Sequence, residues 1–392
     1  MNILLVSSKY QPEYSGSGLR AHNTYKRLKK KYNVNYDILS NSILYHGNKE
    51  YKFDGVEITR ISSPFKISSK KSIWRFVIIF FGFVWEIFYS WRFIRKNINN
   101  YDLLHTFGNT WTIGFLTWYF AKKNKPVIRE LCNEINNPFY PIQFQSFMKF
   151  IFKKNNTLVV AISKKLENLA INFKVKNIWC RLNPVDENRF FVDYKSKYSF
   201  RSKLSKFNQR DVVLTSVANF IDNKNQLFIL DVLNLLPSNF KLILAGPLKP
   251  ENKSYFYQLQ KKIESLRLND RVDLKPGFVD NFDEYLKCSD IFLFPSKSEG
   301  LGTPILESQV CGIPVISNYI KDVTDTMIQK NKGGYFLELN QREWAERIQK
   351  VLKITEVELV KNANYISNIS SSKLIDREYY NLISKLLSNK FE

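Results

Sequence analysis

The sequence is poor in several residue types and motifs that mark common classes of protein. It has only three histidines, and it contains no Asp-x-Asp sequence. The first residues form an apolar, strand-like run without the basic region and cleavage site of a signal peptide, so we expect none. The cysteines form no close pair, which argues against a zinc site or a disulfide framework and fits a reducing compartment: Cys132, Cys180, Cys288 and Cys311.

Acidic residues are scarce in the first half of the chain. Residues 1–185 hold 29 Lys and Arg against 10 Asp and Glu, whereas residues 186–392 hold 30 against 26. A general compositional bias would give both halves a similar excess of basic residues. The net charge of +23 is instead concentrated in the first half, which indicates that this half faces something anionic. Nucleic acid and acidic lipid are the two usual partners of such a surface.

The apolar stretch at residues 73–96 is shorter than a membrane span. Its uncharged core, from Phe76 to Trp85, has 10 residues, and a spanning helix needs about 20. We expect a helix lying on the membrane surface, with tryptophans at headgroup level and basic residues on lipid phosphates: Trp74, Trp85, Trp91, Arg92, Arg95 and Lys96. Phe144–Lys154 is a second candidate. The alternative for both is an ordinary helix packed on a sheet.

Short apolar runs alternate with helical patterns along the chain, which predicts parallel sheets covered on both faces. The alternation pauses in the turn-rich segment 181–190 and restarts at Val212. We therefore expect an α/β protein with two doubly wound domains, residues 1–183 and 184–372. The tail, residues 373–392, is predicted to be a helix that returns to the first domain.

The most informative stretch runs from Phe294 to Glu307 and reads FPSKSEGLGTPILE. Two carboxylates, Glu299 and Glu307, flank a Gly-Leu-Gly turn that precedes a helix begun by Pro304. A helix start presents free N–H groups to an anion such as a diphosphate, and glycines let the backbone approach it closely. The carboxylates can accept hydrogen bonds from sugar and ribose hydroxyls.

This stretch, continued through the Cys-Gly-Ile-Pro-Val-Ile that follows it, resembles the signature of the retaining glycosyltransferases of family GT4. The resemblance covers most of the chain but little of residues 40–100 or the tail. It implies the GT-B fold, in which two Rossmann-like domains face each other across a cleft. It also implies transfer of a hexose-type sugar from a UDP- or GDP-sugar without a metal or other cofactor, in agreement with the absence of Asp-x-Asp.

By this resemblance, Glu307 binds the donor ribose and Glu299 binds the hydroxyls of the donor sugar as a catalytic group. Lys224 stabilises the charge that builds on the leaving diphosphate. Asn219 stands where the family often has an arginine, which leaves one fixed cation fewer on the phosphates. The remaining expected donor contacts are Gly16, Gly18, Gly277, Phe278, Gly300, Leu301, Gly302 and Thr303.

In the first half, Tyr14-Ser-Gly-Ser-Gly follows the first strand and resembles the family's first glycine loop, which approaches the donor phosphates. His105 ends a strand where the family frequently has a polar residue facing the cleft, so we expect it to contact donor or acceptor as a third catalytic candidate. Asn133 or Glu134 is expected to face the acceptor. His22 and His46 are assigned no role.

The resemblance implies retention of the anomeric configuration. Because no carboxylate is clearly placed as a covalent nucleophile, we favour same-face attack by the acceptor hydroxyl, with the departing phosphate accepting its proton. The expected acceptor is a glycolipid, a lipid-linked oligosaccharide or a cell-surface polysaccharide. The protein is then cytoplasmic and attached peripherally to the inner, anionic face of the membrane.

Three alternatives remain. A nucleic-acid-binding protein would fit the charge, but its recognition motifs are missing and the aromatic residues cluster in an apolar stretch. A catalytically silent membrane scaffold or nucleotide-sugar-binding protein could keep the same fold. An epimerase or a phosphorylase could share the architecture, but the two-glutamate signature is typical of the transferases.

Overall fold

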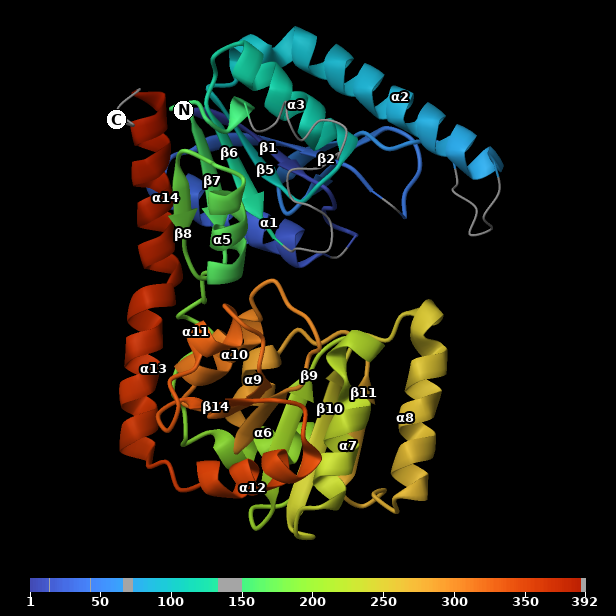
Figure 1. Cartoon of the computed structure of the whole chain (residues 1–392), viewed down its shortest axis with the longest axis vertical. Coiled ribbons are helices and arrows are strands. Elements are labelled where there is room, and N and C mark those ends of the chain that lie inside the picture. The colour runs from blue at the N-terminus through green and yellow to red at the C-terminus, as the bar shows by residue number, and fades with distance from the viewer. Residues whose placement is uncertain (14, 43, 66–72, 133–149, 389–392) are drawn as a thin grey trace. The chain divides into compact units, whose positions relative to one another are not determined.

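The computed structural model describes residues 1–13, 15–42, 44–65, 73–132 and 150–388. The chain divides into two compact units (Figure 1). Unit 1 comprises Met1–Arg181 and Ile375–Glu392, and unit 2 comprises Leu182–Leu374. Each unit contains one sheet of parallel strands, so the predicted α/β fold with two parallel-sheet domains is confirmed.

The sheet of unit 1 has eight strands in the order β3-β4-β2-β1-β5-β6-β7-β8, and every neighbouring pair is parallel except β3 with β4. The inner strands are buried along nearly their whole length, as expected for a parallel sheet covered on both faces. The strands are β1 (Asn2–Ser7), β2 (Asn35–Ser40), β3 (Lys49–Phe53), β4 (Val56–Arg60), β5 (Leu103–Phe107), β6 (Val127–Leu131), β7 (Thr157–Ala161) and β8 (Ile178–Cys180).

Helices cover both faces of this sheet. One core cluster joins α1 (Gly16–Tyr32) to the later part of α14 (Ser372–Leu387), where Tyr32 stacks on Tyr380 at 4.3 Å between ring centroids. A second cluster, on the other face, contains α3 (Trp111–Lys122) and the end of α2 (Ile73–Asn97). The described part of unit 1 also contains η1 (Ile98–Asn100) and α5 (Lys164–Asn172).

The sheet of unit 2 has six strands, all parallel, in the order β11-β10-β9-β12-β13-β14. The strands are β9 (Val212–Val217), β10 (Phe240–Gly246), β11 (Val272–Pro276), β12 (Ile291–Phe294), β13 (Val315–Asn318) and β14 (Gly334–Leu337). The helices are α6 (Lys197–Leu204), η3 (Asp222–Lys224), α7 (Gln226–Asn234), η4 (Pro250–Asn252), α8 (Lys253–Ser265), α9 (Phe282–Lys287), α10 (Thr303–Val310), α11 (Thr324–Met327), α12 (Gln341–Val351) and α13 (Glu356–Ser370).

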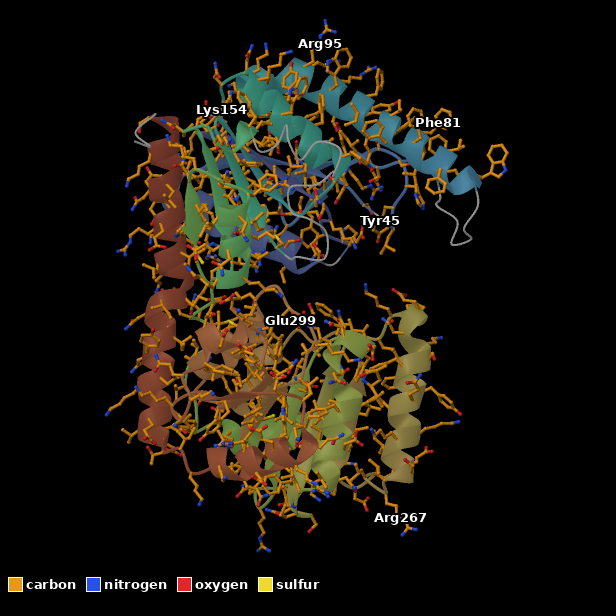
Figure 2. The ribbon with its side chains drawn as sticks, viewed as in Figure 1. Tyr45, Phe81, Arg95, Lys154, Arg267 and Glu299 are labelled. Carbon is orange, nitrogen blue, oxygen red and sulfur yellow. The ribbon has the colours of Figure 1, made fainter. Side chains whose placement is uncertain are left out.

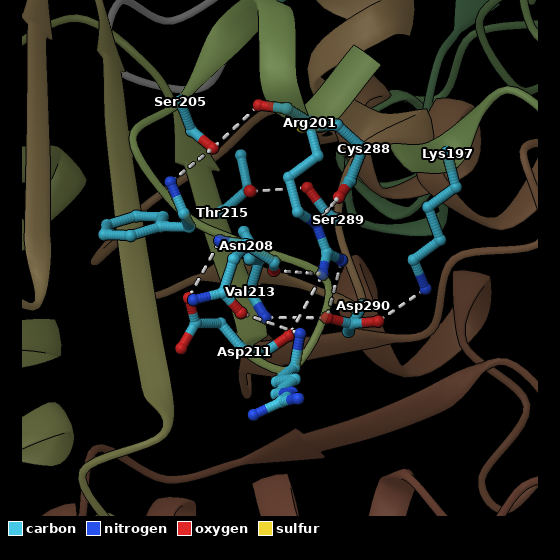
Figure 3. Close-up of polar contacts among 12 residues, drawn as sticks. Lys197, Arg201, Ser205, Asn208, Asp211, Val213, Thr215, Cys288, Ser289 and Asp290 are labelled. Carbon is cyan, nitrogen blue, oxygen red and sulfur yellow. Dashed lines mark hydrogen bonds and ion pairs between the residues drawn. The ribbon is translucent and has the colours of Figure 1, made fainter. Parts of the chain in front are cut away.

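A buried arginine ties α6 to the segments that lead into β9 and β12 (Figure 3). The side chain of Arg201 is 2% exposed, and its guanidinium donates to the backbone oxygens of Cys288, Asn208 and Asp211 and to the carboxylate of Asp290 at 2.9–3.3 Å. These contacts satisfy carbonyl groups that would otherwise be buried without a donor, so Arg201 holds the amino ends of two strands together.

Replacing Arg201 by methionine should therefore destabilise unit 2 by about 3 kcal/mol, because the backbone carbonyls lose a buried donor and Asp290 keeps only its contacts with Lys197 and the N–H of Val213. Urea unfolding measures this change. The control is Arg210→Met, which removes an exposed arginine and should shift the midpoint little. Equal shifts of the unfolding midpoint for the two substitutions would show that the Arg201 contacts do not stabilise unit 2.

Candidate functional site

The loop after β12 turns into α10 without a side-chain cap. Gly302 occupies the N-cap position with φ of 88° and makes no side-chain hydrogen bond to the first turn, in which Pro304 lies. A Cβ atom on Gly302 would lie 3.1 Å from the ring of Phe294. The positive φ therefore favours glycine, and the ring contact leaves little room for a side chain. Pro304 has no N–H and the N–H of Ile305 donates to the carbonyl of Gly302, so the amides of Gly302 and Thr303 are the ones that can bind an anion.

Lys224 and Glu299 meet just before this helix start. Lys224 ends η3, Glu299 lies in the loop between β12 and α10, and their side chains form a short ion pair. The ammonium also lies 5.5 Å from the ring centroid of Phe294. The backbone N–H of Lys297 donates to the carbonyl of Asn223 at 2.9 Å, which holds the two loops together. Glu299 is labelled on unit 2 in Figure 2.

Glu307 lies one helical turn into α10 and is half-buried. No described residue makes a hydrogen bond or an ion pair with its carboxylate. Burial raises the pKa of this carboxyl to about 7, an effect that Arg189 opposes and Asp283 reinforces. A desolvated acceptor without its own donor is suited to accept hydrogen bonds from the hydroxyls of a ligand.

One contact at the helix start was missed by the sequence analysis. The side-chain amide of Asn183 donates to Oγ1 of Thr303 at 2.7 Å. Asn183 falls in the turn-rich segment 181–190, in which the sequence analysis named no site residue. Because the two residues lie 120 positions apart, no local pattern in the sequence could have paired them.

The other predicted donor contacts in unit 2 lie at the carboxyl ends of parallel strands, which share one edge of the sheet. Asn219 follows β9, and its carbonyl accepts from the side-chain amide of Gln226 at 2.9 Å. Gly277 and Phe278 follow β11, and Phe278 is exposed. Gly300 and Leu301 lie in the loop before α10, where Leu301 is buried and offers its backbone alone.

In unit 1, the glycine loop leads into α1. Ser15 is the N-cap residue, and its hydroxyl accepts from the N–H of Gly18 at 3.0 Å. A Cβ atom on Gly18 would lie 2.5 Å from the carbonyl oxygen of Lys9, so glycine is needed for this close approach, whereas Gly16 is exposed with open space beside it. The side chain of Ser15 thus caps part of the first turn of α1.

His105 does not contact ligand space, and its predicted catalytic role is corrected. The side chain is fully buried within unit 1, where Nδ1 bonds the hydroxyl of Tyr25 at 2.7 Å and Nε2 lies 3.7 Å from Glu130. Arg181 and Tyr379 also bind Glu130. Burial lowers the pKa of His105, so the imidazole is a neutral part of the core.

The helix α2 is bound to unit 1 along one side. The Oγ atom of Ser90 donates to Thr112 of α3 at 3.2 Å, Phe83 packs edge-on against Trp111, and Ile94 is buried. The other side carries exposed apolar residues: Trp74, Phe76, Val77, Ile79, Phe80, Phe81, Val84, Phe88 and Trp91. Arg92, Arg95 and Lys96 are exposed near its end, and Arg95 points away from the sheet in Figure 2.

Trp85 differs from its prediction. It is half-buried, its indole N–H donates to Oδ1 of Asn48 at 3.2 Å, and its ring packs on Tyr89. By length and composition alone, one described segment, Phe76–Asn100, is apolar enough to cross a bilayer. Its contacts with unit 1 on one side argue for a helix that lies along a surface instead, so the surface placement stays a prediction.

Several predicted residues lie outside the described ranges: Tyr14, Asn133, Glu134 and the first part of Phe144–Lys154. At the end of that second candidate stretch, Phe150 is exposed whereas Ile151 and Phe152 are buried. Within the described ranges, no group of three or more His, Cys, Asp and Glu side chains could hold a metal ion. Metal independence stays a prediction.

Residues 199–368 match the protein family described as glycosyl transferases group 1. The matched residues lie within unit 2, so the similarity to this family concerns unit 2 alone. The narrower GT4 assignment stays a prediction, and so do the roles of the individual residues of the domain.

Two curated relatives cover parts of the chain. The capsular polysaccharide biosynthesis glycosyltransferase CapH of Staphylococcus aureus is 33% identical over 140 residues, 35% of this chain and 38% of CapH. An Escherichia coli UDP-Gal:alpha-D-GlcNAc-diphosphoundecaprenol alpha-1,3-galactosyltransferase is 24% identical over 210 residues, 52% of this chain and 50% of that protein. The aligned region spans half or less of the length of these two relatives.

Among solved structures, Anabaena Alr3699/HepE in complex with UDP superposes with a TM-score of 0.76 at 14% identity, covering 98% of this chain and 100% of that one. Likeness at this identity shows the fold, which is the GT-B architecture of two parallel-sheet domains.

The raised pKa of Glu307 predicts how the stability of the protein depends on pH. Its folded-state pKa of about 7 exceeds the ordinary glutamate value, so the protonated carboxyl favours folding and that stability is lost as the pH rises through 7. Glu307→Gln should leave the free energy of unfolding little changed at pH 5 and raise it at pH 8. Urea unfolding at both pH values measures this. Exposed Glu346→Gln is the control, and a Glu307→Gln effect of equal size at both pH values would contradict the assignment.

Proposed function

We propose that the protein is a glycosyltransferase that moves a sugar from a nucleoside diphosphate sugar to an acceptor at a membrane surface. The observation that carries this proposal is the uncapped start of α10, with Lys224, Glu299 and Glu307 around it. The family match of unit 2 and the glycosyltransferase names of its relatives support the same reaction class.

In this proposal, the amides of Gly302 and Thr303 bind the donor pyrophosphate at the positive end of the helix dipole. Glu307 accepts hydrogen bonds from the ribose hydroxyls, and Glu299 accepts them from the donor sugar. Lys224 leaves Glu299 to approach the phosphate, where its charge stabilises the leaving nucleoside diphosphate. The structure of HepE with UDP gives the fold a precedent for nucleotide binding.

We infer a retaining, metal-independent reaction. The acceptor hydroxyl attacks from the face that the phosphate leaves, and a departing phosphate oxygen takes the proton of that hydroxyl. Catalysis then comes from positioning and from fixed charge rather than from a covalent carboxylate intermediate. Transfer of a labelled donor sugar followed by NMR reports the anomeric configuration, and an inverted product would contradict this mechanism.

The direct test of the reaction is transfer or slow donor hydrolysis measured over a panel of UDP- and GDP-sugars. Lys224→Ala and Glu299→Ala should each lower kcat by about 10²- to 10³-fold, because each removes a group that acts on the charge or hydroxyls of the donor.

The matched control is Lys297→Ala in the same pair of loops, since Lys297 forms its ion pair with exposed Asp222 instead. A wild-type protein that binds nucleotide-sugars but neither transfers nor hydrolyses them would favour the silent scaffold. If Lys297→Ala lowered kcat as much as Lys224→Ala, the specific role of Lys224 in the mechanism would be contradicted.

The acceptor side of the proposal rests on charge and on α2. The basic excess of residues 1–185 suits an anionic membrane face, and the exposed apolar side of α2 suits the boundary between headgroups and acyl chains. The named relatives act in capsular polysaccharide biosynthesis or on a diphosphoundecaprenol substrate. We propose a glycolipid, lipid-linked oligosaccharide or surface polysaccharide acceptor, and peripheral attachment to the inner face of the cell membrane.

Flotation with vesicles of phosphatidylcholine and phosphatidylglycerol tests this attachment. Phe76→Ser combined with Phe80→Ser should weaken binding by about tenfold or more, because two exposed rings no longer enter the interface. Tyr365→Ser removes an exposed ring on α13 and serves as the control. Binding that is unchanged in the double variant, or absent in the wild type, would remove α2 from the account.

A further inference from the structure

The carboxyl edge of the unit 1 sheet carries an arginine that has no anionic partner among the described residues. Arg60 is the last residue of β4 and lies beside Ser40, the last residue of β2. Ligands of parallel α/β sheets bind outside the carboxyl ends of the strands. The glycine loop that follows β1 opens at the same edge.

The side chain of Arg60 is held between two aromatic rings. The guanidinium carbon lies 5.0 Å from the ring centroid of Tyr45 and 5.8 Å from that of Tyr51. The hydroxyl of Tyr51 donates to the carbonyl of Gln11 at 2.6 Å, so this ring is fixed. Tyr45, labelled in Figure 2, is exposed and covers the guanidinium from the solvent side.

Arg60 is only 8% exposed, and its Nε atom is buried without a hydrogen-bond partner. No described residue forms an ion pair or a hydrogen bond with its guanidinium. Burial of an arginine without an anion is costly, and contacts with aromatic faces recover only part of that cost. The position is therefore unfavourable for the free protein.

The nearby carboxylates are bound to other residues. Glu13, which lies close enough to influence Tyr51, accepts from the hydroxyl of Ser42 and forms an ion pair with Lys9 at 3.5 Å. Asp54, in the turn between β3 and β4, binds Lys26 and His22. Neither group neutralises Arg60.

A second unpaired donor follows on the same extended segment. Ser62 is buried, and its Oγ atom has no hydrogen-bond partner. Side chains two residues apart on an extended chain point to the same face, so Ser62 and Arg60 face the same way. Oδ1 of Asn48 accepts from the N–H of Ser62 at 3.3 Å and also from the indole of Trp85 on α2. The segment is thus attached to the helix whose outer side is apolar.

We propose that Arg60 and Ser62 bind a phosphate-type oxyanion of an amphiphilic acceptor, with Tyr45 as the cover of the site. Arginine presents several N–H groups in a planar fork that matches phosphate oxygens, and a serine hydroxyl adds one more donor. This inference rests on the proposed function and assigns the acceptor its chemistry: a lipid-linked phosphate or diphosphate.

The test measures binding of farnesyl diphosphate, inorganic pyrophosphate and farnesol by calorimetry, with the full chain. All titrations are made in saturating UDP or GDP, whichever raises the melting temperature, so that the start of α10 is occupied and does not report on pyrophosphate. Arg60→Gln should weaken farnesyl diphosphate by about tenfold to a hundredfold, because charge-assisted hydrogen bonds are lost. Arg60→Lys should weaken farnesyl diphosphate binding less than Arg60→Gln does. Pyrophosphate should bind more weakly than farnesyl diphosphate to every protein, and farnesol should bind all variants equally.

Thermal unfolding supplies the readout that a merely structural arginine would not give. Arg60→Gln should raise the melting temperature of the ligand-free protein, since a buried unpaired charge is removed, while farnesyl diphosphate should stabilise only the chains that keep a cation at position 60. A lower melting temperature together with unchanged farnesyl diphosphate affinity would overturn the proposal. Pyrophosphate that binds as tightly as farnesyl diphosphate would overturn the lipid-linked assignment.

Failure of this inference is distinguishable from failure of the proposed function. The calorimetry requires no donor and no transfer, so an intact Arg60 effect in a protein without transfer activity supports the anion site alone. Normal sugar transfer by Arg60→Gln with an unchanged KM for the acceptor overturns the inference and leaves the donor chemistry standing.

Discussion

The left-handed turn at Gly302 determines how α10 begins, and the chemistry of unit 2 depends on that beginning. The positive φ and the tight contact with the ring of Phe294 favour glycine at this position, so the helix lacks the serine, threonine, aspartate or asparagine that usually caps an amino end. Its first amides therefore have no side-chain acceptor within the protein, and an external anion can bind them. The same turn places Glu299 against Lys224 from the neighbouring loop.

Unit 1 shows the difference between buried charge that supports the fold and buried charge that awaits a ligand. Burial by itself raises the pKa of Glu130. Arg181 and His105 nevertheless hold this pKa well below its usual range, and the hydroxyl of Tyr379 also binds the carboxylate. Every charge in this group has a partner, so the group fastens α14 to the sheet. Arg60 is comparably buried but has aromatic faces in place of an anion. The two cases have opposite consequences for stability when the charge is removed.

Local features of the fold and of the site could be predicted from the sequence. The alternation of apolar runs and helical patterns predicted both parallel sheets, and the spacing of Glu299, Gly302 and Glu307 predicted a loop that enters a helix. These features succeed because each depends on residues within one strand–loop–helix segment. The charge asymmetry between the halves of the chain was also readable, since it requires only counting.

Packing between residues far apart in the sequence could not be predicted in the same way. The pairing of Asn183 with Thr303 joins distant segments, and the inward turn of Trp85 depends on Asn48, which comes from a loop before β3. His105 was predicted to end a strand, where binding residues are common, but it lies in the middle of β5, and Tyr25 and Tyr379 cover it from α1 and α14. Arg60 went unnoticed because a lone arginine in a strand carries no motif, and only the structure reveals that no anionic group in the described part of the chain pairs with it.

Hydrogen–deuterium exchange of the first turn of α10, with and without UDP or GDP, tests the central claim most directly. The account predicts that whichever nucleoside diphosphate raises the melting temperature also slows exchange of the amides of Gly302 and Thr303, because phosphate oxygens accept hydrogen bonds from them. A nucleotide that stabilises the protein while these amides exchange as fast as before would contradict it.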